Sequence, residues 1–184
     1  MRTHYHLAKL AQEGERWSGW YRSANLEIHQ SADLHGWQWE RLADLLALCS
    51  PRVAVRRSIR MALHYMRTGQ HLPATVYGTR RAIQRYEEEG MILGPKTRAF
   101  SLALRGDLDA IVLDTWMARA FEVEQGKLST KRVREECERR VRDAAGMMGL
   151  HPAECQAAAW AATMLRNGRR VQVLGLQEEE TLWG

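Results

Sequence analysis

The chain has 184 residues, of which 45% are hydrophobic and 27% are charged. That composition favours a folded domain with a buried core and excludes a disordered chain. The formal net charge of +5 suits a polyanionic partner, because basic side chains that neutralise phosphates release counterions. A basic protein without such a partner explains the charge equally well.

Apolar stretches and cysteines limit the compartment and the cofactors. The uncharged apolar stretches are far shorter than a membrane span, and the first residues lack the apolar stretch of a signal peptide. We therefore expect a cytoplasmic protein without a membrane segment. Cys49, Cys137 and Cys155 are too widely spaced for a zinc or iron-sulfur site. We expect three reduced core thiols, no metal and no cofactor.

Apolar residues recur with helical spacing along the first half of the chain. The stripe at positions 42–49 predicts one helix. The next helix is expected over 50–69, because Ser50 can cap it and Pro51 is tolerated at a first helical position. A third helix is expected over 74–89, before a glycine. No segment shows the alternation that is typical of a strand.

The second half continues the helical pattern. Further helices are expected over 95–104, 115–121, about 130–149 and from 152 onward. Ser129 or Thr130 can cap the third of these, which should close near Gly146 or Gly149. The acidic residues 178–180 are expected to form a solvated tail. The sequence therefore predicts an all-α protein.

A short break between two helices indicates a contact with DNA. Residues 91–95 join the two helices as a helix-hairpin-helix, in which backbone N–H groups can hold a phosphate. A turn at a glycine made for packing alone is the alternative. The residues expected to contact DNA here are Ile92, Leu93, Gly94, Thr97 and Arg98.

Lys96 follows this hairpin directly, and Asp114 lies 18 residues after Lys96. With Pro95 as the first helical residue, Lys96 lies in the first turn, where the helix dipole favours the free, nucleophilic amine. Asp114 closes the apolar run 110–113 and can cap the helix after it, leaving one oxygen for a cleft. A continuous helix over 108–121, with Asp114 on its solvent face, fits the same periodicity.

The segment Gly94-x-Lys96-Thr97, followed by Asp114-Thr115 and Arg119, resembles the helix-hairpin-helix DNA glycosylase superfamily. The chain looks like the endonuclease III and 8-oxoguanine glycosylase/lyase group. More closely, it is similar to small phage-borne members of the superfamily in the phrases Leu48-Cys49-Ser50-Pro51, Gly94-Pro95-Lys96-Thr97-Arg98-Ala99-Phe100 and Gln156-Ala157-Ala158-Ala159-Trp160. The resemblance is strong over roughly residues 45–121. Trp116 stands where that family often has histidine, and the first glycine of the usual Gly-apolar-Gly hairpin is replaced by Ile92.

The resemblance implies a bifunctional glycosylase with abasic-site lyase activity. The lysine matching Lys96 would attack the sugar C1′ of a flipped-out nucleotide, and the aspartate matching Asp114 would stabilise the cation-like transition state. Arg52 resembles the residue that fills the gap in the duplex, and Trp116 is a candidate wall of the base pocket. Other arginines that could face phosphates are Arg56, Arg57, Arg60, Arg80 and Arg81.

We expect one domain over 1–184, with a hairpin lobe at 46–125 and a second lobe from 1–45 plus 126–184. The active cleft would lie between the lobes, and the protein would bind double-stranded DNA as a monomer in a bacterial or phage-infected cell. Two other classes remain open. One is a DNA-binding module without catalysis, in which Lys96 contacts a phosphate; the other is a phage enzyme of DNA base (thymine) modification.

Overall fold

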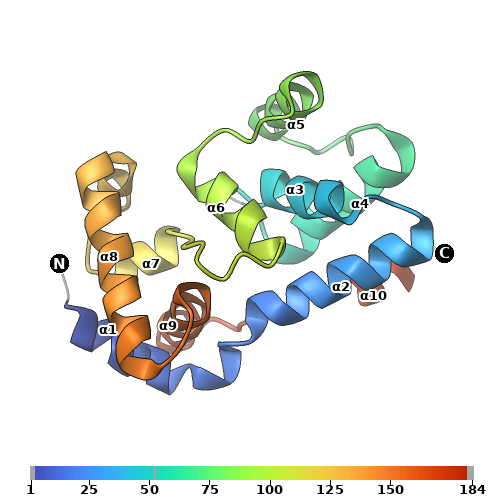
Figure 1. Cartoon of the computed structure of the whole chain (residues 1–184). Helices are drawn as coiled ribbons and strands as arrows, with labels where there is room; N and C mark the ends of the chain where they lie inside the picture. The colour runs from blue at the N-terminus through green and yellow to red at the C-terminus, as the bar shows by residue number, and fades with distance from the viewer. Residues whose placement is uncertain (1–2, 52, 182–184) are drawn as a thin grey trace. The chain divides into compact units, whose positions relative to one another are not determined.

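The computed structural model describes residues 3–51 and 53–181, and these residues form helices and no strand (Figure 1). The elements are α1 (His4–Glu13), η1 (Glu15–Trp17), α2 (Trp20–His35), α3 (Trp39–Cys49), α4 (Val55–Thr68), α5 (Tyr77–Glu89), α6 (Pro95–Leu104), α7 (Thr115–Ala120), η2 (Gln125–Ser129), α8 (Lys131–Met148), α9 (Pro152–Arg166) and α10 (Leu176–Thr181). The expectation of an all-α protein is confirmed.

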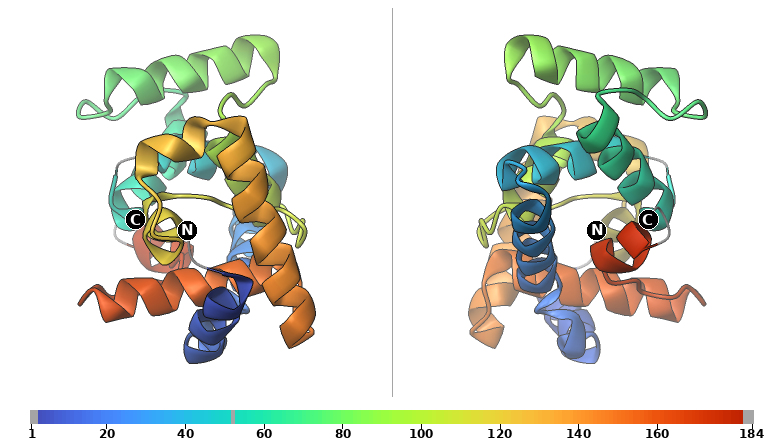
Figure 2. Two further views of the ribbon diagram at one scale, coloured as in Figure 1. Left: turned by 90° about the vertical axis from the view of Figure 1, so that its left-hand side faces the viewer. Right: turned by 90° about the vertical axis from the view of Figure 1, so that its right-hand side faces the viewer.

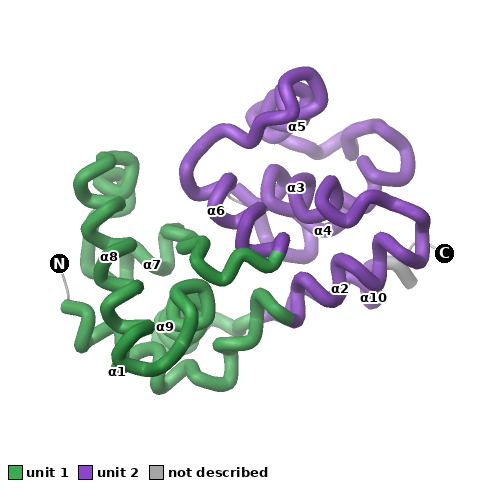
Figure 3. Tube along the Cα trace, in the orientation of Figure 1, with its two compact units in different colours: residues 1–22, 106–171 green, residues 23–105, 172–184 purple. Residues whose placement is uncertain are grey.

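The chain forms two compact units, and each is built from two separate stretches of sequence (Figure 3). Unit 1 comprises residues 1–22 and 106–171, and unit 2 comprises residues 23–105 and 172–184. These boundaries differ from the expected lobes at three places. Residues 23–45 belong with the hairpin, and α3 within them packs against α4, α5 and α6. Residues 172–184 also belong to unit 2, where α10 packs against α4. Residues 106–125 belong to unit 1 because α7 packs against α9 and η2.

Unit 1 is organised around α9, whose alanines allow close helix packing. Helices α1, α7 and α8 all pack on α9, and the views of Figure 2 show α1, α8 and α9 side by side. At the end of α1, a Cβ on Gly14 would lie 2.0 Å from the carbonyl oxygen of Ala158. Glycine is required there because the two backbones touch, and not because of an unusual φ.

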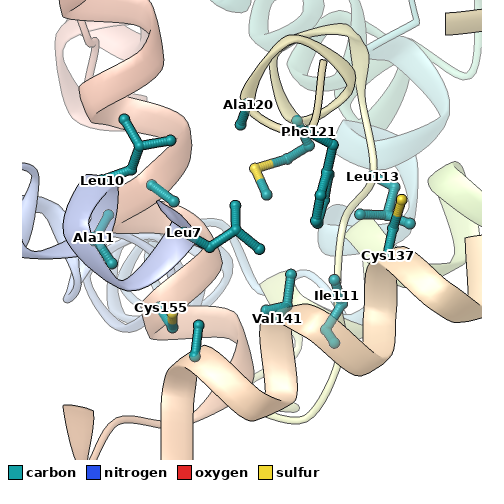
Figure 4. Close-up of a cluster of buried hydrophobic side chains, with 14 of the residues drawn as sticks. Leu7, Leu10, Ala11, Ile111, Leu113, Ala120, Phe121, Cys137, Val141 and Cys155 are labelled. Atoms are coloured by element: carbon teal, nitrogen blue, oxygen red, sulfur yellow. The ribbon is translucent and has the colours of Figure 1, made fainter. Parts of the chain in front are cut away.

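The core of unit 1 joins residues that are distant in sequence (Figure 4). Leu7 of α1, Phe121 after α7 and Val141 of α8 are each at most 1% exposed and lie in one cluster. Ile111 and Leu113 of the extended segment join the same cluster. Burial of such side chains contributes about 1.5–3 kcal/mol each. This core fixes the segment that leads into Asp114.

Unit 2 is centred on α3, which is buried over positions 42–49. Helices α4, α5 and α6 pack against it. The helices expected at 42–49, 74–89 and 95–104 are confirmed, and Gly69 and Gly90 end α4 and α5 in the left-handed conformation. Unit 2 therefore holds both arms of the predicted hairpin on one buried helix.

Two expectations in unit 2 are wrong. Helix α4 begins at Val55 and not at Ser50-Pro51, because Ser50 ends α3, where its hydroxyl donates to the carbonyl oxygen of Ala47. Of the acidic residues expected in a solvated tail, Glu178 is exposed but Glu179 is not. The side chain of Glu179 is 3% exposed and accepts a 2.6 Å hydrogen bond from Arg60 of α4.

The other sequence predictions on the helices and cysteines have clear outcomes. Helix α8 follows Thr130 and closes at Gly149, and α9 begins at Pro152, both as expected. All three cysteines are buried free thiols, and burial raises the pKa of Cys137 to about 11. Within residues 3–51 and 53–181, no helix is long and apolar enough to cross a membrane.

Candidate active site

The hairpin of unit 2 consists of residues 90–94, between α5 and α6. Gly94 has a φ of 89°, a region that only glycine adopts readily, and it leads directly into Pro95 at the first position of α6. Leu93 is 51% exposed and Ile92 is half-buried. In the described part of the chain, the backbone N–H groups of residues 91–94 donate to no protein acceptor. They are available to an anion.

Lys96 lies in the first turn of α6, as the sequence predicted. The chain has four lysines, and Lys9, Lys127 and Lys131 are exposed whereas Lys96 is half-buried. Among the described residues, no carboxylate pairs with Lys96 and no hydrogen bond involves its amine. The fold therefore half-buries one lysine, and the described residues give its amine no counter-ion.

The two residues after Lys96 on α6 differ in solvent exposure. Thr97 is half-buried, with its hydroxyl oxygen 4.0 Å from where a Cβ of Gly94 would lie. Arg98 is exposed and has no carboxylate partner in residues 3–51 and 53–181. Hairpin, Lys96 and Arg98 thus form one continuous segment of unit 2 that presents N–H donors and positive charge.

A buried carboxylate on α3 holds both arms of the hairpin. Asp44 is 5% exposed and accepts hydrogen bonds from the hydroxyl of Tyr86 on α5, at 2.8 Å, and from the hydroxyl of Ser101 on α6. Arg105, at the end of α6, lies 4.0 Å from the same carboxylate. Burial, followed by the hydrogen bond to Asp44, raises the pKa of the Tyr86 hydroxyl. Sequence periodicity placed position 44 in a helix but gave no sign of these partners.

Asp114 belongs to unit 1 and caps α7. Its Oδ1 accepts hydrogen bonds from the backbone N–H groups of Trp116 and Met117, both at 2.9 Å. Residues 110–114 precede the helix in an extended path, so the predicted cap is confirmed and the alternative continuous helix over 108–121 is wrong. The helix starts at Thr115 because the carboxylate satisfies two N–H groups that would otherwise lack acceptors.

The second oxygen of Asp114 is also engaged. Oδ2 accepts a hydrogen bond of 3.1 Å from the indole Nε1 of Trp160 on α9. The ring of Trp160 lies 6.2 Å from that of Trp20, measured between centroids. The next residue, Tyr21, has a buried hydroxyl that donates a hydrogen bond of 3.1 Å to Gln156. Burial and, second, the charge of Asp114 raise the pKa of this hydroxyl.

This environment fixes the direction and the acceptor capacity of the carboxylate. Two ionised oxygens have about four acceptor positions, and Trp116, Met117 and Trp160 occupy three of them. The remaining capacity suits the stabilisation of a nearby cation more than repeated proton transfer. Trp160 is a site residue that sequence reasoning missed, because nothing near it in the sequence indicates its partner.

Trp116 is half-buried on α7, and the guanidinium of Arg119 lies over its ring at 4.4 Å from the centroid. Arg119 itself is exposed. A cation over an indole face is favourable and orients both groups. Trp116 thus has one face occupied, and its role in a base pocket stays a prediction.

Most of the other arginines predicted to face phosphates have protein partners. Arg56 and Arg60 pair with Glu179, whereas Arg57 and Arg80 donate to backbone carbonyls and Arg81 to the hydroxyl of a tyrosine. Arg52, the predicted gap-filling residue, lies outside the described residues. The structure therefore divides this set into neutralised and uncompensated charges, a distinction that the sequence does not contain.

The described residues define an all-α protein. Unit 2 carries a hairpin between two helices and, after it, a lysine that no described carboxylate pairs with; unit 1 carries a helix-capping aspartate. The chain belongs to the family of unknown function DUF7178, whose model matches residues 3–169. No curated protein and no solved structure matches the chain.

Proposed function

We propose that the protein is a DNA glycosylase with abasic-site lyase activity, in which Lys96 is the nucleophile and Asp114 stabilises the developing cation. The observation that carries the proposal is the environment of Lys96. It is the one half-buried lysine of four, it follows a hairpin with available N–H groups, and the described residues offer it no counter-ion. An amine that no carboxylate holds in an ion pair can approach the sugar carbon of a bound nucleotide.

The reaction begins with extrusion of the target nucleotide, since the glycosidic bond is inaccessible inside a duplex. Breaking the C1′–N bond releases the base with the bonding electrons and leaves positive charge on the sugar, which the Asp114 carboxylate stabilises. The Lys96 amine forms a bond to C1′ and gives up one proton; the C1′–O4′ bond then breaks as O4′ takes up a proton, which leaves a protonated imine. Loss of a C2′ proton then expels the 3′ phosphate by β-elimination.

The hairpin has a binding role in this proposal. Its free N–H groups, with Arg98 beside them, would hold a backbone phosphate of double-stranded DNA, an interaction that fixes register without reading sequence. Exposed Leu93 lies at the same tip. Trp116, with Arg119 over one face, would contribute a planar wall to the base pocket.

Borohydride trapping tests the proposal directly. Duplexes carrying an abasic site, uracil, 8-oxoguanine or an oxidised pyrimidine are incubated with the protein and reductant, and the adduct is mapped by peptide mass spectrometry. Because the chain has four lysines, the attachment site is unambiguous. We expect the adduct on Lys96, its loss in Lys96→Ala, and its retention in Lys127→Ala, a matched exposed lysine.

A second variant tests the carboxylate. Asp114→Asn keeps an oxygen for the cap of α7 but removes the charge, so we expect the fold to persist and base release to slow by about a hundredfold or more. Trapping on an abasic site, which needs no base release, should fall less. An adduct on another lysine, or equal rates for Asp114→Asn and wild type, would contradict the proposal.

One observation favours a second candidate, a DNA-binding module without catalysis. Three hydrogen bonds already occupy the Asp114 carboxylate and give it a structural role as a helix cap. Under this alternative Lys96 contacts a phosphate, and Lys96→Ala weakens binding modestly at all sequences. Duplex binding with no adduct on any of the four substrates would select this candidate.

A further inference from the structure

Three arginines are held at the start of α5, where an exposed tyrosine begins the helix. We define the Tyr77 patch as Arg57, Val76, Tyr77, Arg80 and Arg81. Tyr77 is 74% exposed and Val76 is 55% exposed. A tyrosine ring this exposed has a face available to stack on a planar partner.

Each arginine of the Tyr77 patch is fixed by a neutral acceptor. Arg57 donates from Nη2 to the carbonyl oxygen of Ala74 at 2.7 Å. Arg80 donates from Nε and Nη2 to the carbonyls of Thr75 and Pro73, at 2.9 and 2.8 Å. The third, Arg81, contacts the Tyr77 hydroxyl at 3.4 Å. Arg81 is therefore held at the Tyr77 hydroxyl, and Arg57 and Arg80 are held at the carbonyls of residues 73–75, just before Tyr77 in the chain.

The positive charge of the patch is not neutralised. Over residues 3–51 and 53–181, none of its three arginines has a carboxylate within ion-pair distance. Other arginines of unit 2 do have one, since Arg41 pairs with Glu87 and Arg60 with Glu179. Carbonyl oxygens orient a guanidinium without cancelling its charge, so the patch keeps three positive charges in the same part of unit 2 as the exposed Tyr77.

We propose that the Tyr77 patch binds single-stranded DNA, with a base stacked on Tyr77 and backbone phosphates at Arg57, Arg80 and Arg81. Basic side chains beside an aromatic platform are the arrangement that holds single strands without sequence preference. An acidic peptide would satisfy the charges, but it would leave the flat face of Tyr77 without a planar partner. A nucleic acid satisfies both.

The Tyr77 patch is separate from the hairpin. Tyr77 begins α5 and Gly90 follows its end, and the helix has 13 residues. At a rise of about 1.5 Å per residue, the two ends are about 20 Å apart. The inference shares with the proposed function only the choice of DNA as partner, and it does not depend on the chemistry of Lys96.

Binding of a dye-labelled oligothymidine to the full chain, followed by fluorescence anisotropy, tests the stacking. We expect Tyr77→Ala to weaken binding by about tenfold or more, whereas Tyr77→Phe, which keeps the ring, binds almost as well as wild type. Tyr5→Ala is the matched control, because Tyr5 is 66% exposed and belongs to unit 1. It should bind like wild type.

The salt dependence of the same binding tests the phosphate contacts. Each lost contact lowers the slope of log affinity against log salt by about 0.7 for a single strand. We expect that loss for Arg57→Gln and Arg81→Gln. Arg57→Lys keeps the positive charge but loses the guanidinium hydrogen bond to Ala74. It should therefore retain the salt slope even if the segment around Ala74 becomes less ordered. Arg142→Gln, which removes an ion-paired arginine of α8, is the control for net charge.

The outcomes separate this inference from the proposed function. Unchanged binding by Tyr77→Ala overturns the inference, and so does binding that polyglutamate competes for as well as oligothymidine does, which would indicate an acidic peptide. If trapping at Lys96 succeeds while Tyr77→Ala binds normally, only the inference fails. If single strands bind through Tyr77 but no adduct forms, only the proposed function fails.

Discussion

The indole of Trp160 donates a hydrogen bond of 3.1 Å to Oδ2 of Asp114, which lies 46 residues earlier in the chain. The contact joins α9 to the N-terminus of α7 inside unit 1. It leaves the carboxylate fixed at both oxygens, since Oδ1 already caps the helix. A stabilising charge is most effective when it is oriented before the reaction begins.

Trp160→Phe should therefore slow base release without preventing DNA binding. The phenyl ring keeps most of the packing against Trp20 but removes the N–H donor, and hydrogen bonds to charged groups contribute about 1.5–3 kcal/mol. Because Trp160 is half-buried, we expect a loss of about 1 kcal/mol in unfolding free energy. Single-turnover rates and duplex affinity, measured side by side, check this. A fall in affinity with an unchanged rate would contradict the assigned role.

Asp44 should determine the stability of the hairpin arms. Asp44→Ala leaves the buried hydroxyl of Ser101 and the half-buried hydroxyl of Tyr86 without their acceptor. An unpaired buried group costs about 1–3 kcal/mol, and the half-buried one should cost less. Asp44→Asn keeps one acceptor oxygen and should cost less. Tyr86→Phe combined with Asp44→Ala should be less destabilised than the sum of the two single variants. Urea unfolding of the four proteins gives the coupling, and additive effects would contradict the contact.

Two glycine-to-alanine substitutions should change the free energy of unfolding in opposite directions. Gly14→Ala places a Cβ against the Ala158 carbonyl, and overpacking of this kind costs about 1–3 kcal/mol. Gly146→Ala, within α8, meets nothing within 4 Å and should stabilise the protein by up to about 1 kcal/mol, because alanine has the higher helix propensity. Thermal unfolding of both variants checks the prediction. A neutral Gly14→Ala would show that α1 and α9 can move apart.

The acid side of the stability profile should depend on Glu136 in α8. Hydrogen bonds from Arg139 and then Arg140 lower the pKa of its carboxyl from 4.5 to about 2. A lowered pKa in the folded state means that the stabilisation is present above pH 4.5 and is lost as the pH falls through about 2. Glu136→Gln should be less stable than wild type at neutral pH, and the two should converge in acid. Urea unfolding at several pH values measures the difference in unfolding free energy between the two proteins. A difference that does not change with pH would contradict the prediction.

The sequence predicted those parts of the site whose signals are local. Lys96 follows Gly94 and Pro95, two residues with strong backbone preferences, and Asp114 is a preferred cap before a helical segment. The start of α4 was wrong because Ser50-Pro51 can begin a helix but also can end the one before it. In this chain the hydroxyl of Ser50 bonds backward to Ala47.

The contacts that the sequence did not reveal are those between distant residues. Trp160 with Asp114, Asp44 with Ser101, and Glu179 with Arg60 are separated by 46, 57 and 119 residues. Periodicity indicates which face of a helix is buried, but it does not indicate which polar group of a neighbouring element contacts that face. The acidic residues 178–180 resembled a solvated tail for this reason.

The interleaved course of the chain has a consequence for its synthesis. Unit 1 needs residues 1–22 together with 106–171, and the ion pair of Glu13 with Arg166 closes a loop of 153 residues. During translation, helix α1 therefore has no α9 to pack against until most of the chain has been synthesised. Native contacts of such long range slow folding, and during that interval the apolar face of α1, with Leu7 and Leu10, is a target for chaperones.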